Sequence, residues 1–326
     1  MSTSPAVEFT VLGAGAIGSI LSAHLACAGR SVAVLARGQR AQQIQREGLR
    51  ITGLAEISTP VPVLTDPSQL RETQVLIIAT KASGTAAALQ ALRHIKVGTA
   101  FSIQNGLLKN ELLAETFGQE RVLGALANIS GELRASGEVQ LTRNVNVLVG
   151  EPAGGLSPRA QRIAQIVDDS GVRATAVPDI VAQEWGKFVS WVGLVCMSLT
   201  TRAVTWRFLS DADCALVLVR LVREVATLAE AQGIELPDDR SVLPLQTIIE
   251  SPVYEAVTAI QRAGDAFRAN APGHRISALQ DLEAGRPLEV EETLGHALRL
   301  AQRLQLQLPL LEAFYHLATA IDRTRS

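Results

Sequence analysis

Near its N-terminus the chain carries the stretch Val11-Leu12-Gly13-Ala14-Gly15-Ala16-Ile17-Gly18, which follows a strand-like run and leads into an amphipathic segment. In a GxGxxG loop between a strand and a helix, the first glycine permits the tight turn and the second lets a pyrophosphate approach the backbone. The third lets the helix pack closely on the sheet, and the helix N-terminus offers free N–H groups and a positive dipole. The stretch therefore predicts a dinucleotide-binding loop; a glycine-rich turn in an unrelated α/β domain is the alternative.

Strand-like and helical patterns alternate through the first half of the chain. The expected strands span 9–12, 32–35, 75–79 and 101–103, and the expected helices include 19–28 and 86–92. Strands that alternate with helices predict βαβ units and a parallel sheet. A hairpin is expected over 138–141 and 145–149, with Thr142-Arg143-Asn144 as its turn, and a last strand over 173–177.

The pattern changes after Asp179, where apolar residues recur at three- and four-residue spacing. Six helices are expected there, over 180–200, 212–232, 253–269, 276–282, 288–304 and 310–323. The predicted fold class is an α/β Rossmann-type parallel-sheet domain over residues 1–178, followed by an all-α domain over 179–326. At 326 residues the chain is long enough for each domain to bury its own core.

The end of the second expected strand indicates which nicotinamide cofactor binds. NAD-dependent enzymes usually place Asp or Glu there to hold the ribose hydroxyls. In this chain the strand over 31–36 ends in Arg37-Gly38-Gln39-Arg40, with two guanidinium groups and no carboxylate. Planar, forked guanidinium donors suit a phosphate dianion, so the sequence favours NADP(H), with its 2′-phosphate at Arg37. A solvated basic loop is the alternative interpretation.

Composition argues against several classes of protein. A net charge of −2 and a pI of about 6.2 leave no global basic field for nucleic acid or acidic lipid. Cys27, Cys196 and Cys214 are widely spaced and form no CxxC pair, which argues against a disulfide framework or a zinc site. The five histidines lack metal-ligand spacing, so no metal is expected. Because neither a signal-like N-terminus nor a bilayer-spanning apolar stretch is evident, the protein is expected to be soluble and cytoplasmic.

Further segments follow the glycine loop in a definite order. They are Ala79-Thr80-Lys81, Ser102-Ile103-Gln104-Asn105-Gly106, Trp185-Gly186-Lys187-Phe188, the run from Ser277 to Arg286, and Glu289. The first two lie at the expected carboxyl ends of parallel strands, where open α/β sheets bind ligands. Together with the glycine loop and Arg37, this ordered set resembles the ketopantoate (2-dehydropantoate) 2-reductase family from about residue 9 to about residue 298.

The resemblance implies reduction of a 2-oxo acid by hydride from NADPH, between a Rossmann domain and a C-terminal helical domain. Lys187 would be the general acid that protonates the developing alkoxide, and Glu289 would hold that lysine or the substrate. Ser277 would contact the substrate carboxylate, Asn105 would touch substrate or nicotinamide, and Lys81 would lie beside the cofactor. The chemistry agrees, because hydride arriving at a ketone carbon creates an oxyanion that a nearby ammonium can stabilise and protonate.

Each of these residues also has an interpretation without a catalytic role. Lys187 could extend over apolar neighbours on a helix surface. Ser277 could be a helix N-cap, alone or in addition to binding substrate. Glu289, in a run with Glu291 and Glu292, could belong to a solvated acidic helix start, and Asn105-Gly106 could be a turn.

Two positions depart from the family pattern. In the family, the helix with the catalytic lysine usually carries asparagines four and eight residues later, on the same helical face. This chain has Trp191 and Val195 there, which cannot hydrogen-bond a substrate as asparagine does. One explanation is a more apolar or aromatic 2-oxo acid, with Trp191 as a pocket wall. Alternatively, other side chains recognise ketopantoate, or Trp191 only fills the interdomain core.

Three functional hypotheses follow. The first is an NADP-dependent oxidoreductase that reduces ketopantoate, or a more apolar analogue, to the 2-hydroxy acid. The second is a non-catalytic NADP(H)-binding regulator, and the third is a 3-hydroxy-acid dehydrogenase on a related scaffold. The expected partner is a small-molecule 2-oxo acid rather than nucleic acid or a membrane, and the apolar helical half favours a homodimer.

Overall fold

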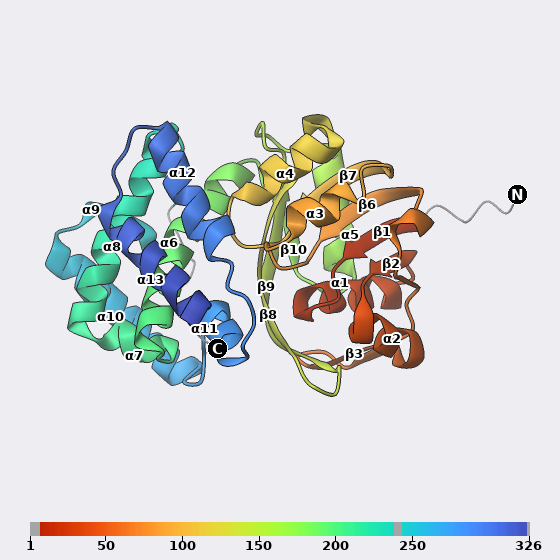
Figure 1. The fold of residues 1–326 in the computed structure, drawn as a ribbon, viewed down its shortest axis with the longest axis horizontal. Coiled ribbons are helices and arrows are strands. Elements are labelled where there is room, and N and C mark those ends of the chain that lie inside the picture. The colour runs from red at the N-terminus through yellow and green to blue at the C-terminus, as the bar shows by residue number, and fades with distance from the viewer. Residues whose placement is uncertain (1–6, 238–242, 325–326) are drawn as a thin grey trace, which may run out of the picture. The chain divides into compact units, whose positions relative to one another are not determined.

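The computed structural model describes residues 7–237 and 243–324, and its first element is the strand that precedes the glycine loop. β1 (Val7–Leu12) passes through that loop into α1 (Ala16–Cys27), as the sequence predicts. β1 lies in the middle of a five-stranded parallel sheet with the order β5-β2-β1-β6-β7 (Figure 1). The other strands are β2 (Val32–Leu35), β5 (Val63–Leu64), β6 (Glu72–Ile78) and β7 (Lys96–Ser102).

The order of the strands reverses at β1. The chain runs outward from β1 through β2 to β5, and then returns to the other side of β1 for β6 and β7. At such a switch point, the loops after two neighbouring strands diverge and leave a crevice for a ligand. Here these are the glycine loop after β1 and Ala79-Thr80-Lys81 after β6. Two of the predicted cofactor segments therefore lie at the switch point.

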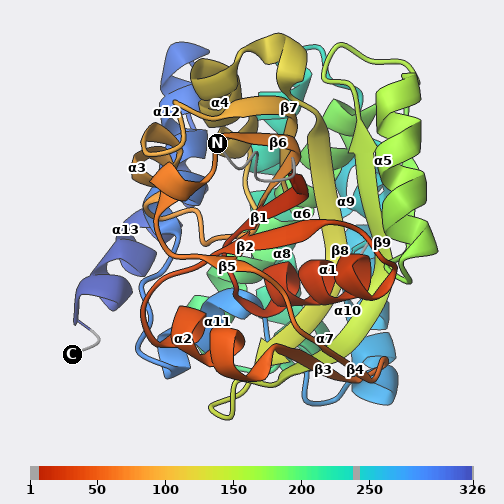
Figure 2. The same cartoon turned by 90° about the vertical axis from the view of Figure 1, so that its right-hand side faces the viewer.

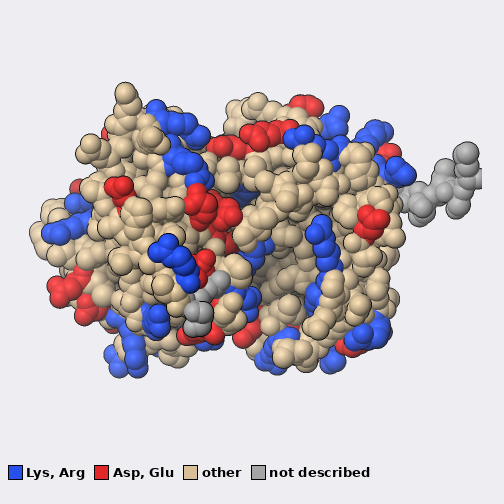
Figure 3. Space-filling view, in the orientation of Figure 1, with Lys and Arg blue, Asp and Glu red and all other residues tan. Residues whose placement is uncertain are grey.

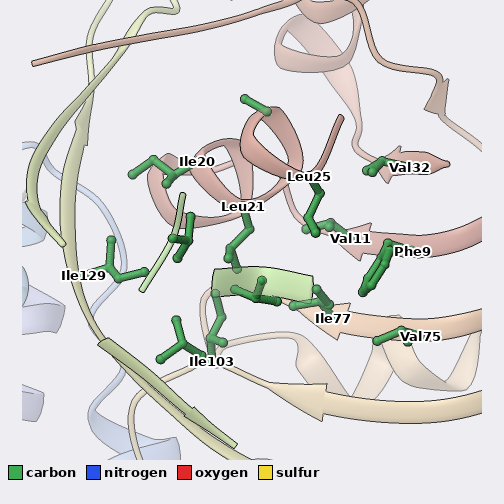
Figure 4. Close-up of a cluster of buried hydrophobic side chains, with 14 of the residues drawn as sticks. Phe9, Val11, Ile20, Leu21, Leu25, Val32, Val75, Ile77, Ile103 and Ile129 are labelled. Carbon is green, nitrogen blue, oxygen red and sulfur yellow. The ribbon is translucent and has the colours of Figure 1, made fainter. Parts of the chain in front are cut away.

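Both faces of the parallel sheet are buried, as its nearly continuous apolar strands require. Phe9 and Val11 of β1 lie in a core that includes the apolar face of α1 (Figure 4). Leu12 belongs to a second core, built with α3 (Thr85–Gln90) and α4 (Leu108–Phe117). Each fully buried large apolar side chain contributes about 1.5–3 kcal/mol. The two cores therefore hold the strand ends, and the loops that follow them, in fixed positions.

A second sheet corrects one prediction from the sequence. The expected turn at Thr142-Arg143-Asn144 is wrong, because these residues continue a single strand, β9 (Val139–Gly150). The antiparallel hairpin partner of β9 is β8 (Gly124–Leu133), which lies beside it in Figure 2. The pairing has irregularities between Asn128 and Ile129 and between Ser130 and Gly131. Such bulges disturb the two-residue alternation by which a strand is found in sequence.

The second sheet contains three further strands. Its order is β10-β9-β3-β4, and β8 pairs with β9 outside this order. β10 matches the expected strand over 173–177, whereas β3, β4 and α5 were not expected. α5 packs against β9 and β10 and begins at a serine cap followed by proline, a common helix start. The bounds are β3 (Leu49–Gly53), β4 (Ile57–Thr59), β10 (Ala174–Ala176), α2 (Gly38–Glu47), α5 (Pro158–Asp169), η1 (Pro67–Gln69) and η2 (Gln119–Arg121).

From Ile180 onward the described chain is helical, which confirms the predicted fold class. Its elements are α6 (Ile180–Thr201), α7 (Thr205–Ser210), α8 (Ala212–Glu230), α9 (Leu245–Glu250), α10 (Val253–Asn270), α11 (Ser277–Glu283), η3 (Glu291–Gly295), α12 (His296–Arg303) and α13 (Pro309–Thr324). α8 packs against α7, α9, α10, α12 and α13, so it forms the centre of this helical core.

The chain divides into two units, and each carries part of the predicted site. The α/β unit comprises the described residues up to Asn105 together with 109–181. The helical unit comprises 106–108 and the described residues from Ala182 onward. The sequence placed the boundary between residues 178 and 179, three residues before this division.

The face shown in Figure 3 has no single dominant charge. Basic and acidic residues are interspersed over the face shown in Figure 3, in keeping with the net charge of −2. The three cysteines are unpaired: Cys27 is exposed, Cys196 is buried and Cys214 is intermediate. Among the described residues, no helix is both long and apolar enough to cross a membrane.

Candidate functional site

The glycine loop of the α/β unit has one packed side and one open side. A Cβ at Gly13 (φ +106°) would lie 2.8 Å from the backbone nitrogen of Thr80, and one at Gly18 would lie 2.0 Å from the carbonyl oxygen of Gly13. These two glycines are therefore required by close packing and, at Gly13, by the left-handed backbone. At Gly15 a Cβ would meet nothing within 4 Å. The space over Gly15, at the start of α1, fits a ligand's pyrophosphate.

Arg40 holds this loop and does not point freely into solvent. Its Nε donates to the carbonyl oxygen of Ala14 at 3.0 Å, and its Nη2 donates to Ser19 Oγ at 2.9 Å. Ser19 Oγ donates to the same Ala14 oxygen at 3.1 Å, which closes a small ring of hydrogen bonds. Nη1 donates to the carbonyl oxygen of Gly137, between β8 and β9, at 2.7 Å. Arg40 therefore ties the glycine loop to α1 and to the second sheet.

This role revises the predicted basic receptor at the end of β2. The sequence offered two guanidinium groups for a 2′-phosphate, but that of Arg40 is half-buried and engaged by the loop. Burial also lowers the pKa of the Arg40 guanidinium. Arg37 is exposed at the start of α2, directly after β2. Of the two arginines, Arg37 is the more exposed to solvent.

Gln104 joins the loops after β6 and β7 and was not recognised in the sequence. Its buried amide nitrogen donates to the carbonyl oxygens of Thr80 at 2.9 Å and Lys81 at 3.1 Å, and to Thr85 Oγ1 at 2.7 Å. Its amide oxygen accepts from Ser102 Oγ at 3.0 Å. The amide thereby fixes the backbone on both sides of the predicted cofactor residue Lys81. Only the folded sheet brings these loops together, so no local pattern could have predicted the network.

Lys81 and Asn105 lie at the carboxyl ends of β6 and β7, as predicted. Lys81 is exposed and Asn105 is half-buried. The turn interpretation of Asn105-Gly106 also holds in the structure, because Gly106 has a φ of +87°. Behind the turn, buried Lys109 donates from Nζ to the carbonyl oxygens of Gln104, at 3.1 Å, and of Ala125. Hydrogen bonds of the Gln104 side chain and of Lys109 to the Gln104 carbonyl oxygen therefore fix the backbone next to Asn105.

In the helical unit, the structure brings four predicted residues to one pocket. Trp191, Val195, Ser277 and Glu289 all line a hollow of about 310 Å³, part of which is open to solvent. The enclosed part of this hollow is far smaller, about 10 Å³, which is room for about one water molecule. Its apolar wall consists of Trp191, Val195, Leu199, Leu288, Val290 and Leu294. Trp191 is half-buried and forms part of this wall.

Most polar side chains of the pocket already have partners within the protein. Thr293 Oγ1 donates to the carbonyl oxygen of Glu289, and Asp281 Oδ1 accepts from Arg286 Nε at 2.8 Å. Ser277 is not a helix N-cap, as one interpretation held: Ile276 occupies that position and Ser277 is the first residue of α11. Ser277 lines the pocket from this first turn of α11.

The backbone beside the pocket forms one π-helical turn, η3. Such turns add a residue to a helix and are frequent at functional sites. Within the turn, Thr293 and Leu294 line the pocket, whereas Glu291 is exposed and accepts from Tyr315 Oη at 2.8 Å. Burial, reinforced by the nearby carboxylates of Glu289 and Glu291, raises the pKa of Glu292. The acidic run is therefore only partly the solvated helix start that the sequence allowed.

Lys187 lies on α6, four residues before Trp191 and eight before Val195, so the three share one helical face. It is half-buried, unlike the surface lysine Lys96, which pairs with Glu72. The chain contains only four lysines, at positions 81, 96, 109 and 187, although it has many arginines.

No candidate metal centre accompanies these groups. Within residues 7–237 and 243–324, no group of three His, Cys, Asp or Glu side chains is arranged to hold a metal ion.

Comparison with known proteins matches both units to one family. The model for ketopantoate reductase PanE/ApbA matches residues 9–154, and the model for its C-terminal part matches residues 179–322. A 2-dehydropantoate 2-reductase from Archaeoglobus fulgidus is 24% identical over 312 residues, which cover 96% of this chain and 97% of that protein.

Two solved structures show the same fold over nearly the whole chain. A PanE/ApbA family ketopantoate reductase from Ralstonia eutropha JMP134 is 22% identical with a TM-score of 0.83, covering 98% of this chain and 99% of that one. The ternary structure of D-mandelate dehydrogenase with NADH and anilino(oxo)acetate is 17% identical with a TM-score of 0.83, again over 98% and 99%.

Proposed function

Because the chain belongs to the ketopantoate reductase family, we propose that it reduces a 2-oxo acid, ketopantoate or a more apolar analogue, with hydride from NADPH. Residues 1–178 would carry the cofactor and residues 179–326 the substrate. The observation that carries the proposal is that Lys187 shares a face of α6 with Trp191 and Val195, which line one hollow together with Ser277 and Glu289. The D-mandelate dehydrogenase neighbour supports it, because mandelate is itself a 2-hydroxy acid.

The α/β unit supplies the groups that would hold the cofactor. The open side of the loop from Gly13 to Gly18, with Ala14, Gly15, Ala16 and Ile17 between them, would receive the pyrophosphate on free backbone N–H groups. Arg37 would pair with the 2′-phosphate, which distinguishes NADPH from NADH. Lys81 and Asn105, at the ends of β6 and β7, would lie beside the nicotinamide half.

The helical unit supplies the groups that would act on the substrate. When bound, the nicotinamide cofactor would supply hydride to the carbonyl carbon. As the C=O π bond breaks, Nζ of Lys187 would give a proton to the carbonyl oxygen. The ammonium also stabilises the negative charge that develops on that oxygen. Ser277 would donate to the substrate carboxylate, and Glu289 would hold Lys187 or the substrate.

The test is NADPH consumption by the purified protein with a panel of 2-oxo acids. Lys187→Ala is expected to lower kcat by roughly 10²- to 10⁴-fold, the usual contribution of a general acid, with NADPH affinity unchanged. Lys96→Ala is the matched control, because Lys96 is an exposed lysine that pairs with Glu72 on the surface. It is expected to retain wild-type activity.

Other outcomes would favour the alternatives. Tight NADPH binding without turnover of any 2-oxo acid would contradict the proposal and favour a non-catalytic regulator. Reduction of NADP⁺ with 3-hydroxy acids, but no reaction with 2-oxo acids, would favour the 3-hydroxy-acid dehydrogenase. Equal activity of Lys187→Ala and wild type would remove Lys187 from the mechanism.

We also propose a homodimer. Val253 and Tyr254, at the start of α10, are exposed large apolar side chains on the helical unit. Light scattering on the eluting protein should then give twice the chain mass of 34.7 kDa. A mass of one chain at micromolar concentration would contradict the dimer.

A further inference from the structure

The hairpin of β8 and β9 has an apolar face and a polar face. The apolar face belongs to the core that also contains α1, and its residues include Ala125, Ile129, Val139, Leu141 and Val147. Because successive residues of a strand point to opposite faces, Asn128 and Ser130 lie on the other side of β8. Across the pair, Asn146 is the partner of Asn128, and Arg143 is the partner of Ser130. These four residues form the polar face of the hairpin.

Arg143 is partly buried on this polar face and has no acceptor for its guanidinium. Burial lowers its pKa, and among the described residues none accepts a hydrogen bond from it or forms an ion pair with it. The other partly buried arginines of the described α/β unit have acceptors: Arg30 has Glu8, Arg40 has backbone carbonyls, Arg121 has Glu120 and Arg159 has Glu151. A guanidinium withdrawn from water without an acceptor costs free energy, which a bound anion would offset.

The polar face lies between two segments that the proposed function assigns to the cofactor. At one end of this stretch of β8, Lys109 links the carbonyl oxygen of Ala125 to the backbone next to Asn105. At the other end, a Cβ on Gly131 would lie 2.7 Å from Ile20 Cδ1 in α1, the helix that follows the glycine loop. The polar face is therefore on the stretch of β8 that connects the Asn105 segment with α1.

We propose that Arg143 binds the carboxylate of the 2-oxo acid and thereby selects for this class of substrate. The inference rests on the proposed function. A planar guanidinium can donate two parallel N–H bonds to a carboxylate, a group that every 2-oxo acid carries beside its ketone. The hydroxyl of Ser277, which the proposed function assigns to the same carboxylate, supplies no charge. Ser130, opposite Arg143, offers a second hydroxyl donor.

The experiment compares Arg143→Met with the wild type in the reduction of ketopantoate and phenylglyoxylate by NADPH. The variant keeps an apolar stem and removes the guanidinium. We expect KM for the 2-oxo acid to rise roughly 10- to 100-fold, the effect of losing a hydrogen bond from a charged donor. The value of kcat should change little, because the carboxylate is bound equally before and during hydride transfer. Arg143→Lys should recover part of the loss, since it keeps the charge without the fork.

Arg134→Met is the matched control. It removes the same charge from the same hairpin, at an exposed position where the guanidinium pairs with Glu138 and Gln140. We expect this variant to keep the wild-type KM. A loss shared by both variants would reflect the net charge of the hairpin and would overturn the assignment to Arg143.

Two further measurements distinguish a substrate ligand from a structural residue and from a cofactor ligand. Because Arg143 donates no bond to the described protein, Arg143→Met should keep or raise the unfolding temperature of the apoprotein. A structural residue would instead lower that temperature together with kcat. The phosphates of NADPH share the oxyanion chemistry of a carboxylate, so the NADPH dissociation constant is measured by calorimetry on the same variant and should not change.

The outcomes separate the inference from the function beneath it. An unchanged KM in Arg143→Met would overturn the inference and leave the 2-oxo-acid reductase standing. Weaker NADPH binding with an unchanged KM would overturn it as well, because the anion would then be a phosphate of the cofactor. A lower unfolding temperature with a lower kcat would make Arg143 structural. Failure of the wild type to reduce any 2-oxo acid, with NADPH bound, would overturn both.

Discussion

Arg40 offers the sharpest test of how the α/β unit is built. Arg40→Met keeps most of the side-chain stem and removes the guanidinium. The change deletes the hydrogen bonds to the carbonyl oxygens of Ala14 and Gly137 and to Ser19 Oγ. In the variant, the carbonyl oxygen of Ala14 still accepts from Ser19 Oγ. The carbonyl oxygen of Gly137 loses the Arg40 donor, because methionine has no N–H group to replace it. The glycine loop should therefore become more mobile, while the fold of the α/β unit is retained.

The expected loss of stability follows from these bonds. A hydrogen bond from a charged donor contributes about 1.5–3 kcal/mol, less where water can replace the donor. Because Arg40 is only half-buried, we expect a net loss of about 2 kcal/mol for the α/β unit. For a unit of this size, that loss lowers the unfolding temperature by roughly 4–8 °C. Differential scanning fluorimetry on the apoprotein measures this shift.

The effect on cofactor binding distinguishes Arg40 from Arg37. Arg40 acts through the glycine loop, which both nicotinamide cofactors would use, so Arg40→Met should weaken NADPH and NADH by the same factor. Arg37 would contact only the 2′-phosphate, so Arg37→Met should weaken NADPH by roughly 10- to 100-fold and leave NADH unchanged. Dissociation constants for both cofactors, measured by titration calorimetry on both variants, give the comparison.

Two results would refute this reasoning. If Arg40→Met weakened NADPH selectively, Arg40 would be a phosphate ligand and the ring through Ala14 and Ser19 would not describe the bound state. If Arg40→Met changed neither stability nor affinity, the hydrogen bonds of the Arg40 guanidinium would make no net contribution to either. Arg40→Lys should recover part of the loss, because an ammonium can still reach one carbonyl but lacks the forked geometry.

Three further predictions concern other parts of the molecule. Gly15→Val should leave the unfolding temperature nearly unchanged, because its Cβ meets nothing within 4 Å, yet lower NADPH affinity more than roughly tenfold in the same titration. Gln104→Leu removes the donor to the carbonyl oxygens of Thr80 and Lys81. We therefore expect the unfolding temperature to fall by roughly 2–10 °C and kcat/KM for the 2-oxo acid to decrease. An unchanged melting curve would contradict this prediction. Burial lowers the pKa of His296 to about 4, below its ordinary 6.5, so the stabilisation from neutral His296 is complete above pH 6.5 and is lost as the pH falls toward 4. The loss should reach about 3 kcal/mol and be absent in His296→Gln, as urea titrations at several pH values would show.

The parts of this fold that depend on neighbouring residues could be predicted from the sequence. The glycine loop combines a strand, a tight turn and a helix start within eight residues, so its geometry follows from adjacent positions. The helices after Asp179 were found because their apolar spacing reflects one buried face each. Trp191 and Val195 were placed on the face of Lys187 by counting residues along one helix. Their common pocket with Ser277 and Glu289 agrees with that assignment.

What the sequence missed depends on contacts between distant segments. β8 and the middle of β9 carry polar residues and bulges, so their strand character comes from pairing with each other and not from alternation. Gln104 lies inside a recognised motif, yet its bonds to Thr80 and Thr85 exist only because β6 and β7 are neighbours. Arg40 was interpreted as a phosphate ligand for the same reason: nothing local reveals that the turn after β8 brings Gly137 to it.

The arrangement along α6 separates Lys187 from the residues that line the pocket. Lys187 lies on one turn, and Trp191, Val195 and Leu199 follow on later turns of the same face. A substitution at 191 or 195 changes the wall of the pocket without altering the helical position of the lysine. The facing wall comes from the segment with the π-helical turn, where Thr293 keeps its hydroxyl bonded to the backbone. Substitutions at 191 and 195 can therefore alter the pocket wall through side chains alone, because the backbone that positions Lys187 stays the same.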